Sequence, residues 1–223
     1  MTENPHRGGI APVLRIQAVL VTIALVAGLA IATVHEWTRP MVMAQRGGEL
    51  GKAALTVMPG AESYRIYTRD ADGRPRLSED DDKHELFIGL DDRGQAVGAA
   101  IVSSGSGYAD TIELVFGLHR DLDRLTGMRV VASRETPGIG TVITDDKEWV
   151  ESFTRIQLPF DDQQRLQRLQ VRENARYEDG EVDAISGATV SVFSVTRIIN
   201  HGLADWLPIL REELDELAGG RGG

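Results

Sequence analysis

The stretch Asp183-Ala184-Ile185-Ser186-Gly187-Ala188-Thr189 stands directly before an apolar run at residues 190–207. The spacing of the run predicts a helix, so this stretch would form the start of that helix. A helix N-terminus has unsatisfied backbone N–H groups and the positive end of the helix dipole, which favour a bound anion. A phosphate esterified to Thr189 would lie in that field. The simpler interpretation is an ordinary helix start capped by Ser186 and packed through small residues.

The residues before this stretch predict a small antiparallel sheet, which gives an α+β fold. Strand-like runs at 85–90 and 95–103 flank the hairpin turn Asp91-Asp92-Arg93-Gly94. Two more strands are expected at 111–118 and 128–133, linked across residues 125–127. Residues 145–153 predict a helix capped by its leading aspartates. The helix after Thr189 is expected to pack on the sheet through residues at helical spacing, namely Val192, Val195, Ile199, Leu203 and Trp206.

Two glycine-rich loops, at residues 104–108 and 135–140, could admit a flat, amphipathic ligand close to the backbone. In the first, Gly105 and Gly107 lack side chains and Tyr108 offers a ring for packing. In the second, Pro137 and Gly138 suit a type II turn, beside the hydrogen-bonding side chains of Glu135 and Thr136. From these residues alone, an ordinary strand connection with a core tyrosine and a turn with exposed polar groups stay open as interpretations.

The N-terminal part of the chain predicts a membrane anchor. Residues 16–34 form an uncharged run of about 19 residues, roughly the length that crosses hydrocarbon, and Trp37 follows as an interfacial aromatic. A cleaved signal peptide is the rival interpretation, because Arg7 and Arg15 precede the run. Positive charges occur on both sides, so they do not decide the orientation. Residues 49–58 predict a juxtamembrane helix that ends at Pro59-Gly60.

Composition excludes several classes of function. The chain has 223 residues, enough for one anchored domain, and a formal net charge of -10, which would repel nucleic acid. It has no cysteine, so any redox chemistry needs a borrowed cofactor. The five histidines have no paired helical spacing, and no metal site is expected. The acidic run Glu79-Asp80-Asp81-Asp82 is interpreted as part of a solvated excursion over 69–83, with a calcium site as the alternative.

A serine hydrolase is the alternative from a different class of function. Ser106 lies between two glycines, and Asp110 and His119 follow closely in the sequence. The spacing of a nucleophile elbow is absent, however.

Three segments together resemble a known family. Residues 183–189 are similar to the Asp-x-x-Ser/Thr-Gly-Ala-Thr/Ser signature of proteins that carry FMN linked through its phosphate to the last hydroxyl residue, here Thr189. Gly105-Ser106-Gly107-Tyr108 and Glu135-Thr136-Pro137-Gly138-Ile139-Gly140 stand at the expected positions. With one membrane helix and this length, nearly the whole chain resembles the G subunit of Rnf-type ion-translocating electron-transport complexes. The C subunit of sodium-pumping NADH:quinone oxidoreductases shares the signature and is the alternative.

The resemblance implies a covalent FMN, a phosphoester of Thr189, in a protein that carries electrons and has no catalytic centre of its own. It implies that residues from both loops and the signature bind the cofactor: Gly107, Tyr108, Glu135, Thr136, Gly138, Ser186, Gly187 and Ala188. A threonine hydroxyl needs a base and charge neutralisation to be esterified, and neither is evident near Thr189. A separate flavin transferase is therefore expected to recognise the signature through Asp183, Ser186, Gly187, Ala188 and Thr189.

The expected organisation follows from the resemblance and the composition. Residues 1–15 would be a cytoplasmic tail, 16–37 a transmembrane helix, 38–60 a juxtamembrane segment, 61–212 a periplasmic FMN-binding domain and 213–223 a flexible tail. The protein would lie in the bacterial inner membrane with other subunits of a complex that couples electron transfer between ferredoxin and NAD to ion translocation. A non-redox, membrane-anchored FMN-binding module is the further alternative.

Overall fold

The computed structural model describes residues 10–78 and 84–219, with the backbone alone at 10–13 and 39–46. Contacts divide the chain into two compact units, Met1–Gln45 and Arg46–Gly223. Helix α1 (Ile10–Val57) begins in the first unit and ends in the second. Within it, Leu14–Thr38 is long and apolar enough to cross a membrane, with a mean hydropathy of 2.3. The predicted apolar helix is therefore present, whereas the acidic run at 79–82 lies outside the described residues.

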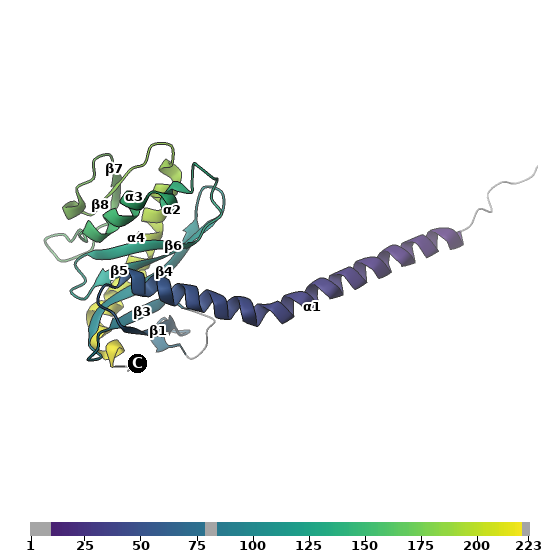
Figure 1. The fold of residues 1–223 in the computed structure, drawn as a ribbon, viewed down its shortest axis with the longest axis horizontal. Helices are drawn as coiled ribbons and strands as arrows, with labels where there is room; N and C mark the ends of the chain where they lie inside the picture. Colours follow the sequence, from purple (N-terminus) through teal and green to yellow (C-terminus); the bar gives the residue numbers. More distant parts are fainter. Residues whose placement is uncertain (1–9, 79–83, 220–223) are drawn as a thin grey trace, which may run out of the picture. The chain divides into compact units, whose positions relative to one another are not determined.

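Six antiparallel strands form the sheet of the second unit, in the order β2-β1-β3-β4-β5-β6 (Figure 1). Their bounds are Ser63–Arg69 for β1, Pro75–Leu77 for β2, Leu86–Leu90 for β3, Ala96–Ser106 for β4, Thr111–His119 for β5 and Leu125–Ala132 for β6. The four predicted strands correspond to β3–β6. The predicted hairpin turn is confirmed, because the Gly94 N–H donates to the Asp91 carbonyl at 3.1 Å.

Two parts of the sheet differ from the prediction. Residues 125–127, predicted as a turn, belong to β6, because Leu125 is fully buried opposite Leu118. The chain turns earlier, before Leu125, where Leu122 adopts a positive φ of 55°. Strands β1 and β2 were not predicted, because their charged residues hid the pattern. Arg69 at the end of β1 is paired with Glu85 and Asp205, which lie far away in sequence.

Both faces of the sheet are covered, and alternate residues serve the two sides. Helix α4 (Thr189–Ala218) packs against one face through Val192, Val195, Ile199, Leu203 and Trp206, all buried as predicted (Figure 1). The other face, which includes Phe87, Ala100 and Val115, is covered by Leu50, Ala53, Ala54 and Val57 of α1. The Thr126 hydroxyl also donates to the Val57 carbonyl.

The structure therefore corrects the boundary between the predicted juxtamembrane segment and the predicted domain. The last three turns of α1 belong to the core of the second unit, which begins at Arg46 instead of residue 61. The physical reason is that this part of the helix buries its apolar side on the sheet. The expected helix at 49–58 is present, but as the continuation of α1, which ends at Val57.

The C-terminal prediction is also corrected. Residues 213–218, expected in a flexible tail, continue α4 because Leu214 and Leu217 are buried in the main core. The Tyr67 hydroxyl donates to the Leu217 carbonyl at 2.6 Å, which ties this last turn to β1. Residues 220–223 of the predicted tail lie outside the described residues.

Short elements connect β6 to α4. They are α2 (Val142–Asp145), α3 (Lys147–Ser152), the 3-10 helix η1 (Phe153–Arg155), β7 (Gln170–Arg172), the 3-10 helix η2 (Tyr177–Asp179) and β8 (Glu181–Asp183). The helix predicted at 145–153 corresponds to α3 and η1, and its predicted aspartate cap is confirmed, because the Asp146 carboxylate accepts from the Trp149 N–H at 3.0 Å. Strands β7 and β8 pair in parallel as a separate two-stranded sheet.

Candidate cofactor site

The carboxylate of Glu135 brings together the two glycine-rich loops and the first turn of α4. Its Oε1 accepts from the backbone N–H groups of Tyr108 and Ala109 at 3.0 and 3.1 Å. Its Oε2 accepts from the Ser191 hydroxyl at 2.7 Å. The side chain is buried, with an exposed fraction of 5% for the residue. Three segments that are far apart in sequence therefore meet at one buried anion.

Two glycines leave room for this carboxylate. A Cβ atom added at Gly107 would collide with Glu135 Oε1, and one added at Gly140 would collide with Oε2. Between them, Gly138 has a φ of +75° and follows Pro137, and the Ile139 N–H donates to the Thr136 carbonyl at 3.2 Å. These features confirm the predicted type II turn.

Hydrogen bonds keep Glu135 ionised despite its burial. Burial alone raises the pKa of this carboxyl. The hydrogen bonds from Ser191 and from the backbone N–H groups of Ala109, Asp110 and Tyr108 outweigh burial, so the pKa lies below its ordinary value. Protein donors bind both oxygens of the carboxylate, so Glu135 positions the loops, and its direct contact with a cofactor stays a prediction.

Asp183, expected to serve transferase recognition, is also engaged by the folded domain. Its carboxylate accepts from the Ala175 N–H at 2.8 Å and from the Tyr177 hydroxyl. Its backbone carbonyl accepts from the indole N–H of Trp149 at 2.9 Å. These bonds fix the end of β8, and the Ala188 N–H then donates to the Ile185 carbonyl at 3.1 Å to form a turn before α4.

Thr189 is the first residue of α4 and is exposed, which satisfies the expectation that the hydroxyl is accessible. The residue before the helix is Ala188, which has no capping side chain, so the expected Ser186 cap is wrong. The first turn also has no acidic residue. In the part of the chain that the structure describes, no side chain accepts from the backbone N–H of Thr189, Val190 or Ser191. The helix start thus keeps its donors and its positive dipole end for an anion.

Large apolar side chains are exposed around this helix start. In the described residues of the second unit, five large hydrophobic side chains are exposed, and four of them belong to the segments tied by Glu135 or to the first turns of α4. They are Tyr108, Ile139, Val190 and Phe193, exposed by 63%, 51%, 51% and 54%. An exposed apolar cluster rimmed by polar groups is typical of a binding site. The sequence pointed to Tyr108 alone, because the segments that carry the other three are brought together with it only in the fold.

The remaining predicted residues lie in the same three segments. Thr136 is half-buried and its carbonyl accepts the hydrogen bonds of the turn, while Gly138 is exposed. Ser186 and Gly187 are exposed, and Ala188 is buried. Direct contact of these residues with a cofactor stays a prediction.

The hydrolase alternative is contradicted by the positions of its three residues. Ser106 ends β4 opposite Thr111, next to Asp110, whereas His119 lies at the other end of β5. A strand of this length separates its ends by roughly 25 Å or more. His119 instead contacts Asp121 and Asp123. Among the described residues, no group of three potential metal ligands occurs either.

Comparisons with known proteins agree with this geometry. The sequence model of the family described as FMN-binding domain matches residues 107–204, which include Gly107 and Tyr108 of the first loop, the whole second loop and Thr189. The chain is 28% identical to the G subunit of an ion-translocating oxidoreductase complex from Methanosarcina acetivorans, over 84% of this chain and 90% of that protein. It is 23% identical to the G subunit of the Na(+)-translocating ferredoxin:NAD(+) oxidoreductase complex of Acetobacterium woodii, over 84% of this chain and 88% of that protein.

Two solved structures share the fold. The crystal structure of Shewanella oneidensis NqrC matches with a TM-score of 0.62 and 20% identity, over 80% of this chain and 100% of that chain. The C subunit of the Na(+)-translocating NADH-quinone reductase from Parabacteroides distasonis matches with a TM-score of 0.55 and 16% identity, over 67% of this chain and 78% of that chain. Residues 107–204 therefore match the FMN-binding domain family, and the chain is related in sequence to the G subunits of ion-translocating oxidoreductase complexes and in fold to NqrC.

Proposed function

We propose that the chain is the G subunit of an ion-translocating ferredoxin:NAD oxidoreductase complex and carries electrons on an FMN esterified to Thr189. The observation that carries the proposal is the convergence of both glycine-rich loops on the start of α4, held by the carboxylate of Glu135. The sequence relatives that are G subunits of such complexes, aligned over most of the chain, support the choice of complex. The fold shared with NqrC fits the related C subunit as well, but at lower sequence identity.

The start of α4 suits the phosphate of the cofactor. Thr189 offers its hydroxyl to solvent, and the uncapped N–H groups and helix dipole stabilise negative charge at that place. The exposed apolar cluster of Tyr108, Ile139, Val190 and Phe193 suits a flat, largely apolar ring. Bound FMN would supply reversible electron transfer, while the protein holds the cofactor and sets its surroundings.

The apolar part of α1 supports membrane attachment. Leu14–Thr38 is exposed along its described side chains, as expected for a helix that contacts lipid. Thr22 and Thr33 donate their hydroxyl hydrogens to the backbone carbonyls four residues earlier, which satisfies these polar groups within the helix. In this proposal the N-terminus is cytoplasmic and the domain is periplasmic, an orientation that rests on the resemblance.

Attachment of the flavin requires another enzyme in this proposal. Acidic side chains near Thr189 are already occupied: Asp183 by Ala175 and Tyr177, and Glu135 by Ser191 and the loop backbone. Neither is available as a general base for the hydroxyl. A flavin transferase would act on the exposed residues Ser186, Gly187 and Thr189. Asp183 would contribute to recognition by fixing the backbone that precedes them.

The test is flavin fluorescence of the denatured full-length protein, purified from membranes of cells with an active flavin transferase, with the labelled peptide identified by mass. Wild type should fluoresce and carry the added mass on Thr189. Thr189→Ala should lose covalent flavin completely, and Thr189→Ser should keep part of it because the hydroxyl remains. Thr154→Ala, which alters another exposed threonine of the same domain, serves as the matched control and should be fully labelled.

Two results would contradict the proposal. Absence of fluorescence in all four proteins would leave residues 183–189 as an ordinary helix start. Flavin that is attached but is not reduced and reoxidised while the purified complex turns over would instead identify a non-redox FMN-binding module.

A further inference from the structure

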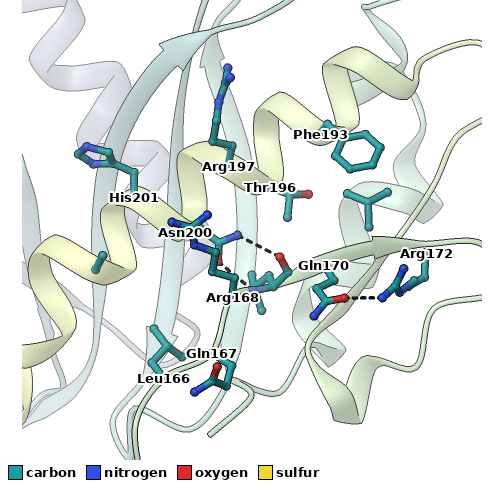
Figure 2. Close-up of a pocket in the computed structure, with 13 residues that line it drawn as sticks. Leu166, Gln167, Arg168, Gln170, Arg172, Phe193, Thr196, Arg197, Asn200 and His201 are labelled. Atoms are coloured by element: carbon teal, nitrogen blue, oxygen red, sulfur yellow. Dashed lines mark hydrogen bonds between the residues drawn. The ribbon is translucent and has the colours of Figure 1, made fainter.

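A cavity of about 830 Å³ lies between α4 and residues 166–172 (Figure 2). We call it the α4–β7 groove. Its helical side begins at Phe193, one turn after Thr189, and extends to Ala204. Eleven residues of helix correspond to about 16 Å. The proposed flavin attachment does not use this groove, although Phe193 belongs both to it and to the exposed apolar cluster.

The groove is positively charged on an acidic protein. Its thirteen described lining residues include Arg168, Arg172 and Arg197 but no aspartate or glutamate, whereas the whole chain has a formal net charge of -10. Arg168 is exposed and forms no hydrogen bond or ion pair with another described residue. Arg172 donates to the neutral side-chain oxygen of Gln170 and reaches Glu181 at 3.9 Å, and Arg197 donates to a neutral carbonyl, that of Ser106, at 2.6 Å. Most of this charge therefore lacks a counterpart within the described chain.

One backbone edge also faces the groove without a strand partner. Gln170 and Arg172 direct their backbone groups to β8, since the Gln170 N–H donates to Gly180 at 3.1 Å and the Arg172 carbonyl accepts from Ala184 at 2.9 Å. Backbone groups alternate sides along an extended chain, so those of Leu169 and Val171 face the opposite way. The Leu169 N–H donates to Oδ1 of Asn200 in α4 at 2.9 Å, and the Leu169 carbonyl accepts from Nδ2 of the same side chain at 3.0 Å.

Asn200 (Figure 2) thus occupies the place of a neighbouring strand at Leu169, while the next pair, at Val171, has no such partner among the described residues and lines the groove. An amide from a second chain placed there would continue the same pattern. Unpaired strand edges commonly bind extended peptides in this way.

We propose that the α4–β7 groove binds an extended, acidic segment of another protein of the complex. About five residues of extended chain match the 16 Å length of the groove. The segment would pair its backbone with Val171, place carboxylates on Arg168 and Arg172, and pack an apolar side chain on Phe193. Because Phe193 follows Thr189 by one turn, the bound segment would lie beside the attachment residue.

This inference extends the proposed function by giving the chain a specific partner, but binding in the groove itself needs no flavin. The two proposals can therefore fail separately. Thr189→Ala should leave the docking intact, and a variant of the groove should keep its covalent flavin.

The experiment places the photo-crosslinking residue p-benzoylphenylalanine at Gln170, an exposed lining residue, in the full-length chain within the purified membrane complex. Cross-linked peptides are identified by mass, and covalent flavin is quantified in the same samples. We expect one product that joins Gln170 to an aspartate- or glutamate-containing segment of another protein of the complex. Arg168→Glu should lower its yield by about ten-fold or more, because like charges then meet in the groove.

Arg129→Glu is the matched control, since it makes the same charge change at an exposed arginine of β6 outside the groove, and its yield should equal that of wild type. Substitution of the captured acidic residue by arginine should restore the yield in Arg168→Glu. The proposal is overturned if the product contains a second copy of this chain, if the captured segment has no acidic residue, if no other protein of the complex is captured, or if Arg168→Glu leaves the yield unchanged.

Discussion

The surroundings of Glu135 and the α4–β7 groove both lie along α4, yet the charged group is hydrogen-bonded in the first and exposed in the second. Glu135 is buried and accepts hydrogen bonds from two backbone N–H groups and Ser191 at 3.1 Å or less. Arg168 in the groove is exposed and unpaired among the described residues. A charge that the fold satisfies contributes to the fold, whereas a charge left to solvent is free to serve a partner. The difference separates a positioning site from a surface for association.

The largest effect should come from Glu135→Ala. It removes the acceptor of the buried Ser191 hydroxyl and of the part-buried N–H groups of Tyr108 and Ala109, and each hydrogen bond to a charged group contributes about 1.5–3 kcal/mol, so we expect a loss of at least ~3 kcal/mol in the free energy of unfolding. Urea unfolding measures this loss. Glu151→Ala, at an exposed position of α3, is the control and should stay within about 0.5 kcal/mol. A loss below about 1 kcal/mol for Glu135→Ala would show that the loops do not depend on this carboxylate.

The second effect is a dependence of stability on acid pH. Because the folded pKa of Glu135 lies below its ordinary value, ionised Glu135 stabilises the fold above about pH 4.3, and this contribution is lost as the pH falls through the folded pKa. Glu135→Gln cannot titrate at this position. The stability difference between wild type and Glu135→Gln should therefore be constant near neutral pH and shrink under acid conditions, as measured by urea midpoints at several pH values. A constant difference down to acid pH would contradict the lowered pKa.

Ser191→Ala should have a smaller effect. It removes one hydrogen bond of 2.7 Å to an ionised carboxylate and leaves the backbone donors in place, so we expect a loss of about 1.5–3 kcal/mol. Ser186→Ala, at an exposed position before the helix, should change stability by less than about 0.5 kcal/mol. Equal losses in the two variants would mean that the Ser191 hydroxyl adds nothing to the Glu135 cluster.

Arg168→Glu should have the smallest effect on stability. The side chain is exposed and has no partner among the described residues, so the change should stay within about 0.5 kcal/mol, like that of Arg129→Glu. Thermal and urea unfolding of the two variants test this. A clear destabilisation by Arg168→Glu alone would make the groove part of the fold and remove the contrast with Glu135.

The sequence was informative wherever the pattern was local. The strand-like runs of β3–β5, the turn at Asp91 and the helical spacing after Thr189 are each set by neighbouring residues, and the structure confirms them. The turn predicted at 125–127 was wrong because the burial of Leu125 depends on its pairing with Leu118 across the hairpin. Strands β1 and β2 were not predicted because Arg69 forms ion pairs with Glu85 and Asp205, which are distant in sequence and come close only in the fold.

The candidate site shows the same division. The motif around Thr189 and both glycine-rich loops could be found from residue types, and the FMN-binding domain match covers the motif, the second loop and the end of the first. The function of Glu135 in holding Tyr108 and Ser191 could not be found in this way, because Glu135 is 27 positions from Tyr108 and 56 from Ser191. Ile139, Val190 and Phe193 carried no signal of their own, since an apolar side chain in a sequence is normally assigned to the core.

The chain's own hydrogen bonds, from Tyr108, Ala109 and Ser191 to Glu135, arrange the three segments. The loops therefore lose their conformational entropy when the chain folds, and attachment at Thr189 need not reorganise them. Fixed backbone dipoles that do not turn when a nearby charge changes also leave little reorganisation energy for a reaction at that place. For a flavin that alternates between charge states, as proposed here, Glu135 would thus contribute to fast electron transfer by holding the surrounding loops in place.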